Sequence, residues 1–471
     1  MKDEYDVIVI GAGPGGEVVA GRCAEEGLAT VVVERELVGG ECAFWGCMPS
    51  KGLLRPGDVL DAARRVPGAR EATSGEVEAP AALQRRDQIT NNWDDKYQVD
   101  WLNQRGAELV RGIGRVAGER RVEVQVENGS VRRLTARRAV VVATGSAAAT
   151  PPIEGLRDIR TWDNRDVTES KAAPHRLLVL GGGAVGVEMA QAWRSLGAEE
   201  VTVIEAADRL LPVEEPFAGE ELESAFRAQG ITVITGVRMV KAVREADDAP
   251  ISATLEDGRV LVGDELLVSV GRRPRTQDLG LESVGLEPGR FIDVDDNLRA
   301  TKVPDGWLYA IGDVCGRALL THMSKYHARC AADHILGRGV EGASQHRAIP
   351  RIVFTDPQIA AVGLTLQQAT DQGIDAVGAR CDIADVAGAV VTGEGVAGPI
   401  GVVVDAGREV IVGATFVGPD IGDMLHGATI AIVAEMPFRK LRHAVPSFPS
   451  LSDVWLKIIE SYDASRKKKS R

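Results

Sequence analysis

The sequence predicts an α/β protein with two nucleotide-binding units and a third, C-terminal region of mixed helices and strands. Two observations carry this prediction: the order strand, glycine-rich loop, helix, strand occurs near residue 11 and again near residue 181. That order places parallel strands in one sheet and helices on its faces. With 471 residues, of which 44% are hydrophobic and 26% charged, the chain resembles globular proteins of about two to four domains.

Charge and composition exclude several classes of partner and compartment. The formal net charge of −13 argues against binding to nucleic acid or to an anionic membrane. The sequence has no apolar run of membrane-spanning length and no visible signal peptide, which predicts a cytoplasmic protein. Six cysteines in a chain of this length are too few for a secreted disulfide scaffold.

The first unit begins with a buried strand at residues 5–10 that runs into the motif GxGxxG. A helix over residues 17–26 and a second strand over 29–33 follow, and this strand ends at Glu34. The glycines permit a tight turn and a close approach of the backbone to a pyrophosphate, at which the helix N-terminus points. Glu34 is placed to accept hydrogen bonds from a ribose, so the unit predicts a dinucleotide site. The motif glycines are Gly11, Gly13 and Gly16.

The second unit repeats this order after a Pro-Pro break at residues 151–152. A strand over 176–180 leads into GxGxxG, and the strand after the next helix ends at Glu205. An acid at this position favours a free ribose 2′-hydroxyl and repels a 2′-phosphate, which predicts NADH rather than NADPH. Arg209 lies close behind and leaves NADPH open as the alternative. The motif glycines are Gly181, Gly183 and Gly186.

Between the two units, residues 39–51 read GGECAFWGCMPSK and hold Cys42 and Cys47. On an ideal helix, residues five apart lie roughly 8–9 Å from each other, beyond the ~7 Å limit for a disulfide. A disulfide here therefore requires a distorted segment, and a strained pair is more easily reduced. Two buried structural cysteines are the alternative. Metal binding is the weaker option, because no CxxC or nearby histidine supplies further ligands.

Taken together, these motifs resemble those of the FAD-dependent pyridine nucleotide–disulfide oxidoreductases. That family includes dihydrolipoamide dehydrogenase, glutathione reductase and mercuric reductase, and the resemblance covers nearly the whole chain. Besides the two glycine loops, its markers are the cysteine box at residues 39–51, Ala143–Gly145, Gly271–Pro274, Ala310–Asp313 and Phe354–Pro357.

The resemblance implies two Rossmann-like dinucleotide-binding domains and a C-terminal α+β dimerisation domain. The FAD-binding domain would be discontinuous, at residues 1–150 and 272–345, around an NAD(P)-binding domain at 151–271. Residues 346–471 would form the interface of a homodimer. The implied cofactors are FAD and NADH, with NADPH possible, and no metal site is implied.

The resemblance also assigns roles to single residues. Cys47 matches the thiolate that lies against the flavin, and Cys42 matches the outer thiol that meets the substrate. Lys51 and Glu188 match an ion pair beside the flavin N5 edge; a helix-end acid that offsets the helix dipole is the alternative for Glu188. Asp313 matches the acid that binds the flavin's ribityl chain. The remaining cofactor-binding residues that it implies are Gly114, Thr144, Gly145 and Gly271.

The C-terminal end departs from the family pattern. Disulfide reductases of the family carry a His-Pro-Thr-x-x-Glu segment whose histidine is the acid/base for the substrate thiol. Phe448 stands at that place, and phenylalanine cannot transfer a proton. His443 would replace the base only in a rebuilt loop, and a surface or core histidine is the alternative. No cysteine follows Cys381, so the C-terminal cysteine pair of mercuric reductases is missing as well.

Further departures lie near the expected flavin site. Phe44 and Trp45 stand between the two cysteines and would line or block the outer thiol. Ala184 replaces a tyrosine that covers the flavin in some members, and would leave that face open. The helix expected after residue 313 carries three polar rings that would pack against the protein or reach the flavin region: His322, Tyr326 and His327.

These features favour an enzyme that passes electrons from NADH through FAD to a Cys42–Cys47 disulfide and on to a small acceptor. Because the histidine base is missing, the expected acceptor is a metal ion, a quinone or an activated disulfide. One alternative is a dihydrolipoamide dehydrogenase or low-molecular-weight disulfide reductase with a replaced acid/base. The other is a redox sensor that keeps the flavin fold and uses the cysteine pair as its switch.

Overall fold

The computed structural model describes residues 3–339 and 347–469. The chain divides into two compact units. The first comprises Met1–Pro49, Arg85–Ala149 and Gly271–Gln345, and the second comprises Ser50–Gln84, Thr150–Val270 and His346–Arg471. In the part of the chain so described, no helix combines the length and the hydropathy needed to cross a membrane.

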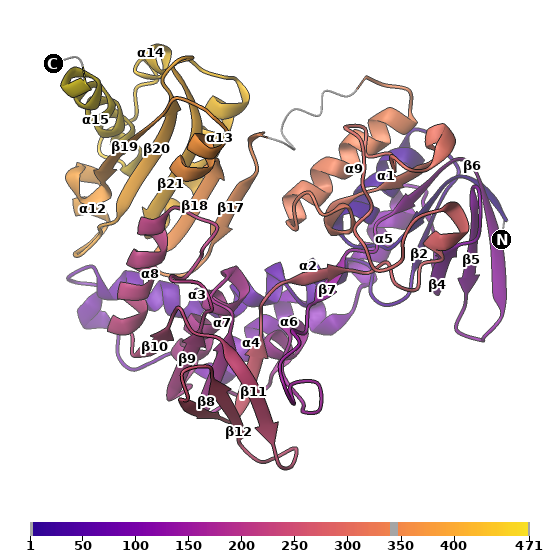
Figure 1. The fold of residues 1–471 in the computed structure, drawn as a ribbon, viewed down its shortest axis with the longest axis horizontal. Coiled ribbons are helices and arrows are strands. Elements are labelled where there is room, and N and C mark those ends of the chain that lie inside the picture. Colours follow the sequence, from indigo (N-terminus) through magenta and orange to yellow (C-terminus); the bar gives the residue numbers. More distant parts are fainter. Residues whose placement is uncertain (1–2, 340–346, 470–471) are drawn as a thin grey trace. The chain divides into compact units, whose positions relative to one another are not determined.

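A seven-stranded sheet forms the centre of the first unit, in the order β3-β2-β1-β6-β5-β4, with β16 beside β6. Five of its strands are parallel, and β4 and β5 extend it in antiparallel pairing (Figure 1). Strand β1 is buried at nearly every residue, the pattern of a parallel strand that is covered on both faces. The strands are β1 (Glu4–Ile10), β2 (Thr30–Glu34), β3 (Glu108–Arg111), β4 (Ile113–Val116), β5 (Arg121–Gln125), β6 (Val131–Val142) and β16 (Leu308–Ala310).

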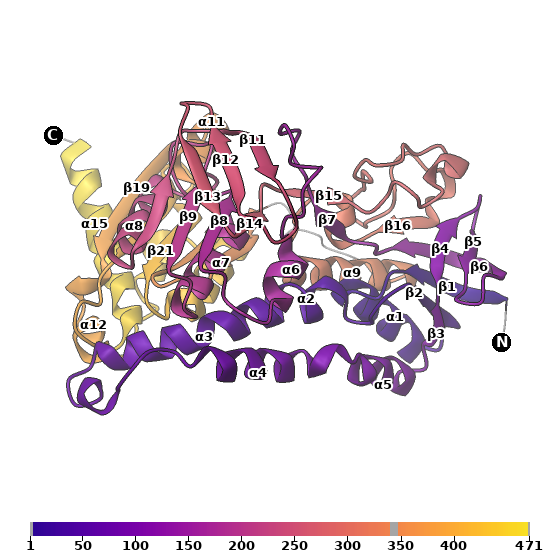
Figure 2. The same ribbon diagram turned by 90° about the horizontal axis from the view of Figure 1, so that it is seen from below.

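Helices α1 (Pro14–Glu25) and α9 (Thr321–Ile335) pack against each other in this unit, as Figures 1 and 2 show. A side chain at Gly21 of α1 would collide with Trp101 of α5 (Lys96–Gln104), so the glycine lets these two helices approach closely. The short helix α2 (Gly40–Phe44) follows β2. Helices α3 (Cys47–Arg64) and α4 (Ala79–Ile89) each run across the boundary between the units.

A small two-stranded sheet brings distant motifs of the first unit together. Strand β7 (Ser146–Ala148) pairs antiparallel with β15 (Arg272–Pro274). This places the Gly-Arg-Arg-Pro motif beside the Ala-Thr-Gly motif that precedes β7. The Ile-Gly-Asp motif follows strand β16 and forms the 3-10 helix Gly312–Cys315.

The second unit contains a four-stranded parallel sheet in the order β10-β9-β8-β14. A separate three-stranded antiparallel sheet has the order β11-β12-β13. Helix α7 (Ala184–Ser195) follows β8, and eight of its residues are buried. The strands are β8 (Arg176–Leu180), β9 (Glu200–Ile204), β10 (Ile231–Ile234), β11 (Met239–Arg244), β12 (Ile251–Leu255), β13 (Val260–Gly263) and β14 (Glu265–Val268); the other helices are α6 (Asn164–Glu169) and α8 (Pro216–Ala228).

The C-terminal part of the second unit is a five-stranded antiparallel sheet in the order β17-β18-β21-β20-β19. Helix α13 packs on β18 and β21, and α15 packs on β19 and β20. The strands are β17 (Pro350–Val353), β18 (Gln358–Gly363), β19 (Ala376–Asp382), β20 (Pro399–Asp405) and β21 (Val410–Gly418); the helices are α11 (Leu366–Asp371), α12 (Ala387–Thr392), α13 (Leu425–Val433), α14 (Phe438–Leu441) and α15 (Val454–Lys469).

This architecture confirms the predicted fold class, since parallel sheets carry both glycine motifs and a mixed α+β region ends the chain. The expected boundary between residues 345 and 346 lies outside the described residues.

Candidate functional site

The first glycine loop has the geometry of a phosphate cradle. Gly11 has φ +100°, and a Cβ there would lie 2.5 Å from the carbonyl oxygen of Ala143. At Gly16 a Cβ would lie 2.0 Å from the carbonyl oxygen of Gly11, so both positions require glycine. At Gly13, by contrast, a Cβ would meet no protein atom within 4 Å. Gly13 is also the N-cap of α1 and supplies no side-chain cap, so the first N–H groups of the helix remain available to an anion.

The second glycine loop repeats this geometry. Gly181 has φ +107°, and its Cβ would lie 2.7 Å from the carbonyl oxygen of Ser269. A Cβ at Gly186 would lie 2.0 Å from the carbonyl oxygen of Gly181, whereas Gly183 again has no protein atom within 4 Å of that position. Of the three motif glycines in each loop, two are therefore crowded and one faces open space.

The acid after each loop also holds that loop in place. The Glu34 carboxylate accepts hydrogen bonds from the backbone N–H of Ala12 at 2.6 Å and of Glu36 at 2.8 Å. The Glu205 carboxylate accepts from the N–H of Gly182 and of Ala207, both at 2.7 Å. A carboxylate offers about four lone-pair sites, so each acid can still accept from a ribose hydroxyl.

The two cysteines do not lie on one helix. Cys42 belongs to α2 and Cys47 is the first residue of α3, with a break at Trp45, whose φ is −136°. The break removes the helical spacing that would have kept the thiols apart, and both cysteines are free thiols in this structure. Hydrogen bonding to Cys47, together with burial, raises the pKa of Cys42. The Cys47 Sγ lies 3.2 Å from the Oγ1 of Thr321 at the start of α9.

The aromatic residues between the cysteines point into the protein. Phe44 and Trp45 are 1% and 8% exposed, with ring centroids 5.8 Å apart. The indole N–H of Trp93 donates to the carbonyl oxygen of Phe44 at 3.2 Å. Their burial shows that both rings pack inside the protein, and the expectation that they line or block the outer thiol stays a prediction.

Lys51 and Glu188 form an ion pair in the second unit. The Nζ of Lys51 lies 2.6 Å from Oε2 of Glu188, whose other oxygen accepts the N–H of Phe354 at 3.0 Å. The Glu188 side chain is only 5% exposed, whereas that of Lys51 is 34% exposed. A buried carboxylate needs such partners to stay charged. This pairing accounts for an acid in the interior better than the helix-dipole alternative does.

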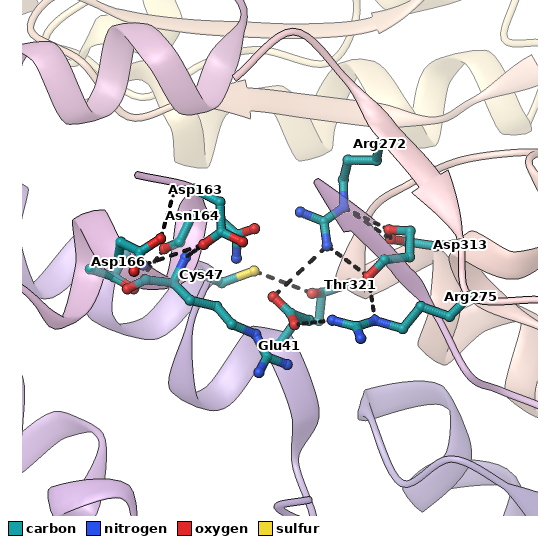
Figure 3. A network of polar contacts seen from close by, with 12 residues as sticks. Glu41, Cys47, Asp163, Asn164, Asp166, Arg272, Arg275, Asp313 and Thr321 are labelled. Atoms are coloured by element: carbon teal, nitrogen blue, oxygen red, sulfur yellow. Dashed lines mark hydrogen bonds and ion pairs between the residues drawn. The ribbon is translucent and has the colours of Figure 1, made fainter. Parts of the chain in front are cut away.

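Asp313 lies in a polar network of the first unit (Figure 3). Its carboxylate accepts a hydrogen bond from Ser146, whose Oγ in turn accepts from Nε of Arg272 at 2.6 Å. Burial raises the pKa of Asp313, while the Ser146 bond and the Arg272 charge oppose that rise. Glu41 enters the same network through Arg275, with 3.0 Å between Oε1 and Nη2.

The structure also shows features that fit a bound flavin nucleotide around the remaining predicted residues. The buried Oγ1 of Thr144 has no hydrogen-bond partner among the described residues, which suits an external ligand. Gly145 and Gly271 have positive φ values of +70° and +142°. A Cβ at Gly114 on β4 would lie 3.0 Å from Cγ1 of Val33, a tight contact with a side-chain methyl group.

The histidines considered as replacement bases differ sharply in exposure. His327 is fully buried; its Nδ1 accepts the N–H of Gly312 at 3.3 Å, and burial lowers its pKa to about 4. His443 is exposed, and Phe448 is 75% exposed. Five residues with contacts here were not among the predicted site residues: Glu41, Ser146, Arg272, Arg275 and Thr321. Each lies in or near a motif, but their contacts join positions far apart in sequence, so no local pattern assigned them.

Two dinucleotide cradles, with a close pair of thiols beside the first, define a flavin- and nicotinamide-dependent redox protein. Comparison with known families agrees: residues 5–330 match the model "Pyridine nucleotide-disulphide oxidoreductase", and residues 349–458 match the dimerisation domain of the same name. The chain therefore belongs to the pyridine nucleotide–disulphide oxidoreductase family and is an FAD-dependent enzyme of that family.

Relatives of two activities are similar to this chain. It is 31% identical over 455 residues to a mercuric reductase of Bacillus cereus, covering 96% of this chain and 70% of the relative. It is 32% identical over 466 residues to a dihydrolipoyl dehydrogenase of Thermus scotoductus, covering 97% of both chains. Identities this close to one another do not separate the two activities.

Solved structures share the fold over nearly the whole chain. The HOCl-induced flavoprotein disulfide reductase RclA of Escherichia coli is 24% identical with a TM-score of 0.83, covering 97% of this chain and 99% of that one. LpdA of Mycobacterium tuberculosis is 26% identical with a TM-score of 0.83, covering 96% and 99%.

Proposed function

We propose that this enzyme transfers electrons from NADH through FAD to a Cys42–Cys47 disulfide and then to a small acceptor that needs no histidine base. The observation that carries this is the close pair of thiols at the broken helix, next to the first glycine cradle in one compact unit. A dihydrolipoamide dehydrogenase with a replaced acid/base is the second candidate, favoured by the identity to enzymes of that name.

FAD, when bound, supplies the two-electron relay between the nicotinamide and the disulfide. In this proposal the first glycine loop holds its pyrophosphate, Glu34 its ribose and Asp313 its ribityl chain. The unpartnered Oγ1 of Thr144 and the open space at Gly13 support this placement. The full set proposed for FAD is Gly11, Gly13, Gly16, Glu34, Lys51, Gly114, Thr144, Gly145 and Asp313. Gly271, at the end of the proposed NAD-binding domain, is proposed as cofactor-binding without assignment to one nucleotide.

The second glycine loop would bind NADH, with Glu205 on the ribose diol. Arg209 donates hydrogen bonds to the carbonyl oxygens of Pro212 and Glu214, at 2.9 and 3.1 Å. An arginine committed to backbone oxygens is less available for a 2′-phosphate, which supports NADH over NADPH. The residues proposed for the nicotinamide cofactor are Gly181, Gly183, Gly186 and Glu205.

The disulfide step balances with one hydride equivalent from NADH. Two electrons and one proton enter, the sulfur–sulfur bond breaks, and a thiol remains on Cys42 with a thiolate on Cys47. The hydroxyl of Thr321 is within reach to donate a hydrogen bond to that thiolate. Lys51, held by buried Glu188, is the proposed cation at the flavin edge.

The acceptor must not depend on a base at residue 448, because phenylalanine stands there. Metal ions, quinones and activated small disulfides meet this condition. The similarity to mercuric reductases supports a metal ion, although no cysteine follows Cys381 to deliver one.

We also propose the domain division given by the family pattern, with FAD-binding residues 1–150 and 272–345, NAD-binding residues 151–271 and interface residues 346–471. The dimerisation-domain match supports a homodimer. Six cysteines in 471 residues are too few for a secreted disulfide scaffold, which supports a cytoplasmic location.

An acceptor screen with NADH tests the proposal. The rate of NADH oxidation is measured for purified wild-type holoenzyme and for the variants Cys42→Ser and Cys47→Ser. The acceptors are mercuric and cupric ions, a quinone, a small activated disulfide and lipoamide. Cys381→Ser is the matched control, since Cys381 lies in the C-terminal sheet. We expect Cys42→Ser and Cys47→Ser to lose acceptor turnover and Cys381→Ser to keep it. Full activity in both would show that the pair is incidental, and lipoamide turnover at rates normal for the family would select the second candidate.

A further inference from the structure

Glu41, the residue immediately before Cys42, is held by two arginines in the first unit (Figure 3). Its Oε1 lies 3.0 Å from Nη2 of Arg275, and its Oε2 lies 3.8 Å from Nη2 of Arg272. The three side chains are only 22% to 26% exposed. Charges so shielded from water interact more strongly than surface pairs do.

The arginines are themselves anchored, so they are a fixed counter-charge. Nε of Arg275 and Nη2 of Arg272 both donate to the carbonyl oxygen of Ser146, each at 3.0 Å. Arg272 also donates to the Ser146 hydroxyl at 2.6 Å and lies 3.8 Å from Asp313. Of the two arginines, Arg275 lies nearer to Glu41, at 3.0 Å compared with 3.8 Å for Arg272.

The segment that carries Cys42 is also held by the N–H of Gly39, which donates to the carbonyl oxygen of Ala12 at 2.7 Å, and by Phe44, which accepts from Trp93. Helix α2 has five residues, no side-chain cap and two left-handed glycines at its start, Gly39 at φ +110° and Gly40 at φ +56°. The Glu41 contacts tie this short helix to β15, which is more than 200 residues away in the chain.

Reduction of the cysteine pair changes its charge, and Glu41 directly precedes Cys42 on the short helix α2. Uptake of two electrons and one proton breaks the sulfur–sulfur bond and leaves one thiol and one thiolate. A neighbouring carboxylate disfavours the new negative charge, and neighbouring guanidinium groups favour it.

We propose that Glu41 and Arg275 form a charge pair that sets the reduction equilibrium of the Cys42–Cys47 disulfide; this rests on the proposed function of that disulfide. Both are positioning residues that act through the cysteines. The Glu41 carboxylate disfavours the thiolate that reduction creates, and the Arg275 guanidinium offsets the negative charge of Glu41. The net charge of the two side chains therefore sets how readily the Cys42–Cys47 disulfide is reduced.

The pair makes predictions of opposite sign for its two members. Glu41→Gln removes the negative charge beside the arginines, so the disulfide becomes easier to reduce. Arg275→Gln exposes the carboxylate, so the disulfide becomes harder to reduce. We expect shifts of roughly tenfold in the thiol–disulfide equilibrium constant, about 30 mV for two electrons. The double variant should return toward the wild-type value, because both charges are gone.

The experiment equilibrates intact holoenzyme with stepped dithiothreitol redox buffers and traps thiols with an alkylating agent. Mass spectrometry of the peptide containing Cys42 and Cys47 then reports the fraction reduced, without any acceptor. Arg133→Gln is the matched control, because it removes another arginine–glutamate ion pair of the first unit. Nε of Arg133 on β6 lies 3.0 Å from Oε1 of Glu123 on β5. We expect no shift for it.

The outcomes separate the inference from the function on which it rests. Shifts in the same direction for both single variants, or no shift, would overturn the charge-pair role and leave the disulfide function standing. Such same-sign shifts would indicate a purely mechanical tie on α2. Failure of the wild-type cysteines to form a disulfide in any buffer would overturn both.

Discussion

At the scale of single residues, the hydroxyl of Thr321 lies 3.2 Å from the Sγ of Cys47. We expect Thr321→Val to reduce the thiolate fraction of Cys47 at a given pH, because a hydrogen bond to a charged group contributes about 1.5–3 kcal/mol. The measurement is the pH dependence of alkylation of reduced enzyme. Thr321→Ser keeps the hydroxyl and should behave as wild type; an identical pH profile in the valine variant would rule the contact out.

The Lys51–Glu188 pair should respond asymmetrically to substitution. Lys51→Met leaves a buried carboxylate with one backbone partner, and we expect the free energy of unfolding to fall by about 2–4 kcal/mol. Glu188→Gln leaves a lysine that is one-third exposed and can be hydrated, so its cost should be smaller. Denaturant unfolding of both variants and of the double variant measures this. Equal costs for the two single changes would contradict the burial argument.

His327 makes folding stability depend on pH in a defined direction. Its pKa is lowered from 6.5 to about 4, chiefly by burial and secondly by Arg317, so the folded protein keeps it neutral where the unfolded chain binds a proton. Its contribution is present above pH 6.5 and is lost as the pH falls from 6.5 toward 4. The pH slope of the unfolding free energy across that window gives the number of protons taken up on unfolding, and we expect His327→Asn to take up one proton fewer than the wild type. An unchanged slope in the variant would contradict this.

At the scale of elements, the first glycine loop separates folding from cofactor binding. Gly13→Ala adds a Cβ where no protein atom lies within 4 Å, so we expect normal apoprotein stability and at least about tenfold weaker FAD binding. Gly16→Ala places a Cβ 2.0 Å from a carbonyl oxygen and should lower both the stability of the apoprotein and its affinity for FAD. Flavin fluorescence titration and thermal unfolding of apoprotein provide the two measurements. Unimpaired FAD binding by Gly13→Ala would place the pyrophosphate elsewhere.

The elements that local sequence dictates were predictable, and contacts between distant segments were not. Both glycine loops follow from backbone requirements that only glycine meets, and buried strand β1 follows from its apolar run. The break between α2 and α3 was inferred only as a distortion, because spacing alone does not say where a helix stops. The Glu41–Arg275 contact joins residues 234 positions apart, so no local pattern encodes it.

At the scale of the whole molecule, the dimerisation domain should bury apolar side chains that the single chain exposes. Ile430 on α13 is 51% exposed, and a carboxylate at an apolar interface is costly. We expect Ile430→Asp to shift the enzyme from dimer to monomer in sedimentation at micromolar concentration. Val131→Asp, at an equally exposed valine of the first unit, is the control. Dimers of unchanged stability in the first variant would place the interface on another face.

Glu205 supports the second glycine loop and is also the residue proposed to bind the ribose, and this limits how the coenzyme preference can change. Its two oxygens already hold the N–H groups of Gly182 and Ala207, so the residue that would read the ribose is also a support of the loop. Replacing it to admit a 2′-phosphate would release both amides and loosen the cradle for either coenzyme. A change of coenzyme preference at this position therefore requires a second change that restores the hydrogen bonds of the loop.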